Sequence, residues 1–206
     1  MFEEPPDVDS EIIFVGRSNV GKSTLMREIT GKKVDIGRRP GVTLEPNHYD
    51  WASESFMITD MPGFGFMGGV REERIEEIKN NIVRYIERHS DRILLAVQVI
   101  DAKSFVDIVD RWRDRGEVPH DIDLYNFLTD VDIPVIIAAN KMDKVDNRDE
   151  RLNEISERFG LLPPWRQWDD IIAPISAKRG SIEPLLRNIR DELKNQKRHD
   201  LLKFFS

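Results

Sequence analysis

The chain has 206 residues, with 31 lysines and arginines against 38 aspartates and glutamates, which gives a formal net charge of −7. This length predicts one domain over residues 1–206, with an N-terminal extension over 1–10 and a C-terminal tail over 199–206. The lack of cysteine excludes disulfides, thiolate metal sites and lipidation of thiols. No apolar run approaches the roughly 18 residues of a membrane span, so we expect a cytoplasmic protein without membrane contact.

Apolar runs rich in β-branched residues alternate with helical stretches along the chain. Helices are expected over 22–30, 71–89, 121–130, 148–159 and 181–198. Strands buried on both faces are expected over 11–16, 54–60, 92–101, 133–141 and 171–176, with an additional edge strand over 47–53. This order predicts an α/β fold, a doubly wound and mainly parallel sheet flanked by helices. Ligands of such sheets bind beyond the carboxyl ends of the strands.

The stretch "GRSNVGKS" lies between the first predicted strand and the first helix and matches the phosphate-binding loop pattern. Its backbone N–H groups and the helix N-terminus attract an anion, Lys22 reaches the β- and γ-phosphates, and the Ser23 hydroxyl binds Mg²⁺. A glycine turn with an incidental lysine is the alternative, which this context disfavours. The predicted nucleotide contacts of this loop are Gly16, Arg17, Ser18, Asn19, Val20, Gly21, Lys22, Ser23 and Thr24.

Asp60 and Gly63 begin the stretch "DMPGFGF" at the end of the second buried strand. The Asp60 carboxylate is placed to hold Mg²⁺ through a water, and the Gly63 N–H to contact the γ-phosphate. Alone, Asp-x-x-Gly is a common turn. Its position at a strand end, after a phosphate loop, favours the functional interpretation.

The stretch "NKMD" closes the fourth buried strand and predicts the choice of base. A carboxylate at Asp143 can accept both the N1–H and the 2-amino hydrogens of guanine, a pair that adenine cannot supply. Asn140 and Lys141 belong to the same element, and Lys141 would also brace the phosphate loop. The triplet Ser176, Ala177 and Lys178 follows the last strand, where the Ala177 N–H could reach the guanine carbonyl. Together these elements predict a site for GTP and GDP.

Thr43, in "RRPGVTLEP", is the leading candidate for a threonine that closes over Mg²⁺ and the γ-phosphate, with Gly41 beside it. Its segment, about 32–46, is expected to order on the γ-phosphate. Thr59 and Thr30 are weaker candidates, because Thr59 is expected to pack in a strand and Thr30 lies near a helix end. We assign catalytic roles to Lys22, Thr43 and Gly63, and metal contacts to Ser23, Thr43 and Asp60.

The sequence resembles the EngB (YihA-type) GTPases of the TrmE, Era, EngA, YihA and septin class, over nearly the whole chain. The motifs that carry the resemblance are "GRSNVGKSTL", "PGVT", "DMPGFGF", "NKMD", "SAK" and the spacer "HDIDLYNFLTDVDIPVIIAANKMDK". The resemblance implies a stand-alone GTPase that acts in assembly of the large ribosomal subunit in bacterial relatives. It also implies a need for the protein in division and septation, which could be indirect.

The resemblance further implies that Phe64 stands where other GTPases carry a water-orienting glutamine, so we expect slow intrinsic hydrolysis of GTP. A K⁺ ion held by Asn19, as in related enzymes, or a group supplied by a partner would provide the missing charge. Asn19 could instead only shape the loop, and Phe64 could only pack below it.

The segment 103–119 is longer than the corresponding bacterial loop, as expected of an archaeal relative, and predicts a helix with Phe105, Val109 and Trp112 packed inward. A docking surface is the alternative. The leading functional hypothesis is a monomeric switch that binds the large ribosomal subunit or its rRNA. The rRNA phosphates would be contacted by Lys32, Lys33, Arg38, Arg39, Arg71 and Arg74. The alternatives are a protein-binding switch in division without RNA contact, or a scaffold that binds nucleotide only.

Overall fold

The computed structural model describes residues 2–31, 45–63 and 72–206. Six strands form one sheet in the order β2-β3-β1-β4-β5-β6, in which β2 is antiparallel to β3 and the other neighbours are parallel. The strands are β1 Ser10–Val15, β2 Asn47–Trp51, β3 Phe56–Asp60, β4 Ile93–Asp101, β5 Val135–Asn140 and β6 Ile172–Pro174. Every residue of β1 and β3 is buried, which confirms the predicted central strands.

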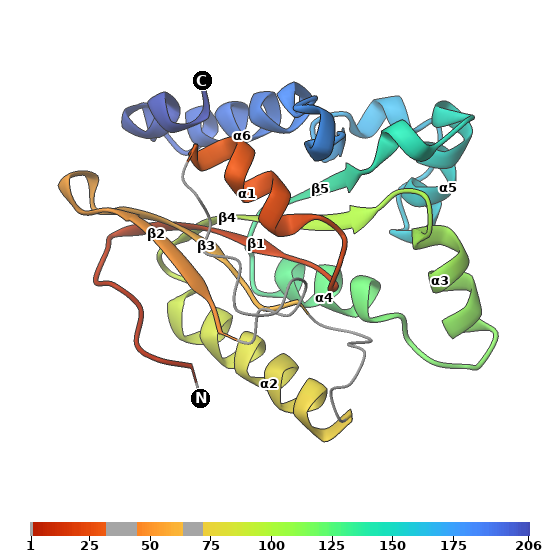
Figure 1. Cartoon of the computed structure of the whole chain (residues 1–206), viewed down its shortest axis with the longest axis horizontal. Helices are drawn as coiled ribbons and strands as arrows, with labels where there is room; N and C mark the ends of the chain where they lie inside the picture. The colour runs from red at the N-terminus through yellow and green to blue at the C-terminus, as the bar shows by residue number, and fades with distance from the viewer. Residues whose placement is uncertain (1, 32–44, 64–71) are drawn as a thin grey trace.

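Helices cover both faces of the sheet (Figure 1). They are α1 Lys22–Thr30, α2 Glu72–His89, α3 Phe105–Arg113, α4 His120–Asp130, α5 Arg148–Arg158 and α6 Glu183–Asn195. Successive side chains of β1 point to opposite faces of the sheet and contribute to two separate cores. Ile12 and Phe14 pack with α1 and α6, whereas Ile13 and Val15 pack with α2 and α4. A third core joins α3 and α5 to the ends of β4, β5 and β6. The doubly wound fold predicted from the sequence is therefore confirmed.

The predicted edge strand is shorter than expected, because the chain turns early. β2 ends at Trp51, a 3₁₀ helix occupies Ala52–Glu54, and Ser55 adopts a left-handed conformation with φ of 47°. The next strand therefore begins at Phe56 rather than at 54. Pattern alone does not reveal such a turn, since no glycine or proline marks it.

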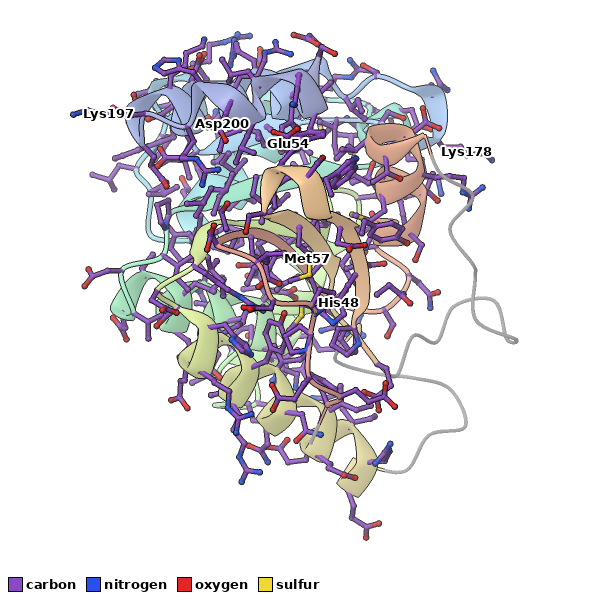
Figure 2. The ribbon with its side chains drawn as sticks, turned by 90° about the vertical axis from the view of Figure 1, so that its left-hand side faces the viewer. His48, Glu54, Met57, Lys178, Lys197 and Asp200 are labelled. Carbon is purple, nitrogen blue, oxygen red and sulfur yellow. The ribbon has the colours of Figure 1, made fainter. Side chains whose placement is uncertain are left out.

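The segment 199–206, predicted as a C-terminal tail, packs on the core of the domain. α6 ends at Asn195, short of the predicted 198, and a 3₁₀ helix follows over His199–Phe205. Leu201 and Phe205 are buried in the same core as α1 and α6, and Phe56 stacks with Phe204 at 5.3 Å between ring centroids. Figure 2 shows Glu54 below this segment, and its carboxylate accepts from Lys203 Nζ at 2.8 Å. The segment therefore holds the turn between β2 and β3.

The long segment 103–119 contains α3, as predicted. Phe105 and Val109 are buried, and the Phe105 ring stacks on Phe159 of the α5 end at 5.0 Å. Trp112 is only half-buried and packs on the His120 ring at 4.4 Å. Among the described residues, no helix is both long enough and apolar enough to cross a membrane.

Candidate active site

The phosphate loop leaves the carboxyl end of β1 and enters α1, in the middle of the sheet (Figure 1). Gly16 has φ of 145°, and a Cβ there would lie 2.3 Å from the backbone oxygen of Val99 on the neighbouring strand β4. Only glycine fits at this position, because the loop starts against another backbone. The turn therefore places the loop directly over the β1–β4 pair.

Lys22 is the first residue of α1 and is only 7% exposed. Its ammonium donates to the Gly16 carbonyl at 3.3 Å. Burial lowers the pKa of Lys22, and the carboxyls of Asp60 and Asp121 oppose that change. A buried ammonium with so weak a set of partners is stabilised strongly by an anion, so this position suits a phosphate.

Asp60 ends β3 beside the loop and is 1% exposed. Its Oδ2 lies 3.5 Å from the Ser23 hydroxyl, and its Oδ1 has no hydrogen-bond partner in the described part of the chain. Burial raises the pKa of Asp60, although Lys22 and Ser23 oppose the change. A carboxylate oxygen without a partner next to a hydroxyl fits a hard divalent cation such as Mg²⁺.

Gly63 packs against the phosphate loop. A Cβ at Gly63 would lie 2.7 Å from Ser18 Oγ and 2.9 Å from Ser18 Cα. Any side chain at 63 would therefore push the loop away. The segment after β3 thus starts in contact with the loop, where its N–H can respond to what the loop binds.

Asn140 ends β5 and connects three parts of the site with one buried side chain. Its Nδ2 donates to the Val20 carbonyl at 2.8 Å, and its Oδ1 accepts from the N–H groups of Lys141 at 2.8 Å and Ala177 at 3.0 Å. The sequence predicts that the Ala177 N–H can reach a guanine carbonyl. The structure instead gives it a protein partner, which a guanine carbonyl would have to share or replace.

Lys141 braces the phosphate loop, as the sequence predicted. Its Nζ donates to the Asn19 carbonyl at 2.7 Å and to Asp101 Oδ2 at 2.6 Å. Asn19 itself has φ of 67°, which asparagine tolerates better than most residues. The aspartate at the end of β4 therefore orients the lysine, a role that the sequence analysis did not assign to Asp101.

Asp143 and Ser176 come together from the ends of β5 and β6. The Ser176 hydroxyl donates to Asp143 Oδ1 at 2.6 Å, which lowers the pKa of Asp143, and Arg179 Nε lies 3.5 Å from Oδ2. Asp143 therefore stays ionised as an acceptor. Lys178 is exposed at the edge of the molecule beside α1 (Figure 2).

Several predicted residues do not meet the site in the expected way, or lie outside it. The Arg17 side chain turns below the loop toward Asp121 Oδ2, at 3.9 Å. Thr24 is half-buried in the first turn of α1. Gly41, Thr43 and Phe64 lie outside the described residues. The predicted site did not include Gln98 and Asp121. The signal for Gln98 was a glutamine inside a strand predicted to be buried on both faces, and the signal for Asp121 was an acidic residue in the first turn of a helix.

The fold and these elements together define a P-loop GTPase. The sequence matches the model of a family described as "50S ribosome-binding GTPase" over residues 11–141. The chain belongs to this family, and within it to the EngB group.

Relatives and solved structures support the same family assignment. The chain is 59% identical over 206 residues to a probable GTP-binding protein EngB of Halorubrum lacusprofundi, with both chains fully covered. It is 51% identical to the EngB protein of Methanosarcina mazei, over 96% of this chain and 94% of that one. A crystal structure of a probable GTP-binding protein engB matches with a TM-score of 0.82 and 46% identity, over 90% of this chain and 100% of the other. The Era protein of Aquifex aeolicus, at 24% identity and a TM-score of 0.61, shares the fold.

Proposed function

We propose that this GTPase is a switch in assembly of the large ribosomal subunit, acting as a monomeric single G domain in the cytoplasm. The observation that carries the switch is the contact of Gly63 with Ser18, because it joins the phosphate loop to the segment that follows β3. A γ-phosphate bound in the loop would bias that segment between two states. The ribosomal partner is supported by the family description, which names binding to the 50S particle.

We assign phosphate binding to the loop and to two residues around it. Lys22 would contact the β- and γ-phosphates of GTP, Ser23 and Asp60 would hold Mg²⁺, and the Gly63 N–H would contact the γ-phosphate. The cation, when bound, neutralises charge that develops on the phosphate oxygens. Thr43 is proposed to complete this set, from the part of the chain that the structure does not describe.

We assign base selection to the ends of β5 and β6. Asp143, which Ser176 orients at 2.6 Å, would accept the two N–H donors of guanine. Asn140 would stabilise the part of the site that binds the base, since its side chain is already hydrogen-bonded to both Val20 and Ala177. Lys141 would lie along the base with its ammonium fixed on Asn19 and Asp101.

Hydrolysis requires charge stabilisation from a source other than position 64, where phenylalanine cannot orient water. We propose that the Asn19 side chain, exposed at the top of the loop, holds K⁺ beside the phosphates. Replacing K⁺ with Na⁺ at constant ionic strength should then slow turnover. Equal turnover in both salts would assign the missing charge to the ribosomal partner.

The ribosome-binding proposal is tested by co-sedimentation with large ribosomal subunits, comparing a non-hydrolysable GTP analogue with GDP across a salt series. Contacts from Lys32, Lys33, Arg38, Arg39, Arg71 and Arg74 to rRNA phosphates predict binding with the analogue that weakens steeply with salt. Of these residues only Arg74 lies in the described part, where it pairs with Glu77 at 2.5 Å and is half-exposed. Equal binding with the GTP analogue and with GDP would contradict the proposal.

A second candidate is a switch that binds a protein partner in cell division and septation, without RNA contact. The formal net charge of −7 favours it, because an acidic protein is repelled by nucleic acid. Absence of nucleotide-dependent sedimentation with ribosomal subunits, together with salt-insensitive capture of a division protein, would support this candidate instead.

A further inference from the structure

A buried polar cluster lies below the phosphate loop, and it includes the side chain of the loop residue Arg17, which turns toward Asp121 and not toward the predicted nucleotide. It consists of Arg17 from the loop, Gln98 from β4 and Asp121 from the first turn of α4. Gln98 pairs in register with Val15, the last residue before the loop, so the cluster lies where β1 ends. Gln98 is fully buried, and Asp121 is 1% exposed.

The cluster connects the loop to the start of α4. Gln98 Nε2 donates to the backbone oxygen of Asp121 at 2.6 Å, which fixes the first turn of the helix against the sheet. Asp121 Oδ2 lies 3.9 Å from Arg17 Nη1, a distance that suits an ion pair but is too long for a hydrogen bond. Lys22 is the second cation that acts on this carboxyl.

Three atoms of the cluster have no hydrogen-bond partner within the described residues, namely Arg17 Nη1, Gln98 Oε1 and Asp121 Oδ1. One is a donor and two are acceptors, so a single water could satisfy all three by accepting once and donating twice. Burial raises the pKa of Asp121 to about 6, against the opposing effects of Arg17 and Lys22. The carboxyl therefore remains mainly ionised at neutral pH, as a counter-charge for the guanidinium.

We propose that Asp121 is a positioning residue of the phosphate loop, on which it acts by keeping the Arg17 guanidinium in place below the loop. The Arg17 side chain is 16% exposed, so its charge is largely removed from water and depends on the carboxylate below it. Without that carboxylate the guanidinium moves toward solvent and takes the loop backbone with it. The loop has little tolerance for this movement, because Gly16 packs on Val99 and Ser18 packs on Gly63. The N–H groups that receive the phosphates then lose their arrangement.

This inference rests on the proposed nucleotide site, and Asp121→Asn tests it by removing the charge at nearly constant volume. The measurement is the Kd for a fluorescent GDP analogue, with Mg²⁺ present. We expect the Kd of D121N to rise about tenfold, as for coupled buried pairs. The matched control is Asp123→Asn, an exposed acid of the same helical turn, which should bind as the wild type does.

The double variant distinguishes the positioning role of Asp121 from a purely structural role. Arg17→Met with Asp121→Asn removes both charges, so no guanidinium is left without a counter-charge, and it should recover most of the affinity that D121N loses. Circular dichroism melting confirms that each variant is folded. Wild-type affinity in D121N, or a double variant no better than D121N, would overturn the positioning role. Wild-type protein that binds no GDP would instead refute the nucleotide site itself.

Discussion

A carboxylate is buried at each of the two ends of the sheet, and the two carboxylates have different surroundings. Glu11 lies near the start of β1 and is fully buried, and Asp60 lies at the end of β3 and is 1% exposed. Burial raises the pKa of both groups. The two groups differ in their hydrogen-bond partners. This difference distinguishes a carboxylate that stabilises the fold from one that is placed to bind a ligand.

Glu11 has donors on both oxygens. The Tyr85 hydroxyl donates to Oε1 at 2.8 Å, and Arg92 Nε donates to Oε2 at 3.1 Å. Arg92 also donates to the Tyr85 hydroxyl and to the Pro6 carbonyl. These bonds tie the N-terminal residues, β1, α2 and the start of β4 together. A buried charge with this set of partners is compensated within the protein.

Among the described residues, Asp60 keeps one oxygen without a partner, and Lys22 beside it has only a long hydrogen bond to a carbonyl. Such groups are costly in an empty site and are stabilised when a phosphate and a cation bind. The comparison therefore predicts that substitutions at the Glu11 end change stability alone, and that substitutions at the Asp60 end change nucleotide chemistry alone.

The largest expected effect on stability is that of Glu11→Ala. It leaves Arg92, whose side chain is 12% exposed, without its counter-charge, and the free energy of unfolding should fall by about 3–5 kcal/mol. Urea denaturation measures the change, with the exposed Glu117→Ala as control. Nucleotide affinity of the folded fraction should not change, and a loss of affinity as large as the loss of stability would remove the distinction between the two ends.

Lys22→Met should show the opposite pattern. The substitution keeps the apolar stem and removes a buried ammonium, so the nucleotide-free protein should be about as stable as the wild type. The rate of GTP hydrolysis should fall about 10²–10³-fold, the loss typical of one positioned electrostatic group in an active site. Phosphate release under single-turnover conditions measures it, with the exposed Lys103→Met as control. Unchanged hydrolysis would exclude Lys22 from the chemistry.

Asp143→Asn should change which base the site prefers, without changing how it binds the phosphates. Guanine offers donors at N1 and at its 2-amino group, whereas xanthine carries a carbonyl at C2, which an asparagine amide can bind. The preference for guanine over xanthine nucleotides should therefore fall by about 100-fold. Competition between the two diphosphates measures the ratio, with the exposed Asp146→Asn as control. A ratio unchanged by D143N would mean that the Asp143–Ser176 contact is only structural.

Much of the fold and of the site could be predicted from the sequence. The alternation of apolar runs with helical stretches predicted the buried strands, and the helix after the phosphate loop was found at Lys22–Thr30 as expected. These predictions succeed because their signals are local: burial on both faces shows in a continuous apolar run, and the loop pattern fixes its own place between strand and helix.

The rest depends on contacts that are distant in sequence. The Asp121–Arg17 pair and the network around Glu11 join residues whose types are ordinary surface types, so no local pattern marks them as buried. The 3₁₀ helix His199–Phe205 was missed because its apolar residues lie in a short charged stretch without helical periodicity. The partner of the Ala177 N–H likewise depends on Asn140, which reaches it from another strand.

The smallest expected effect is a dependence on pH beside the Glu11 network, because the His48 ring stacks on that of Tyr85 with 6.1 Å between the ring centroids. His48 lies beside Met57 on the β2–β3 hairpin (Figure 2), with its Nδ1 3.0 Å from Thr59 Oγ1. Burial, followed by the charge of Arg92, lowers the pKa of His48 from 6.5 to about 4. Between these values the unfolded chain binds a proton that the folded protein does not bind. Stability should therefore fall as the pH falls from 7 to 5.

His48→Gln isolates this contribution. Because His48 is partly exposed, we expect about 1 kcal/mol of the wild-type loss between pH 7 and pH 5 to disappear in the variant. Exposed His199→Gln is the control, and it should keep the wild-type profile. The difference between variants is the measured quantity, because Asp121, with its pKa raised to about 6, contributes in the opposite direction over the same range. Equal profiles for H48Q and wild type would show that the hairpin histidine is not part of the buried network.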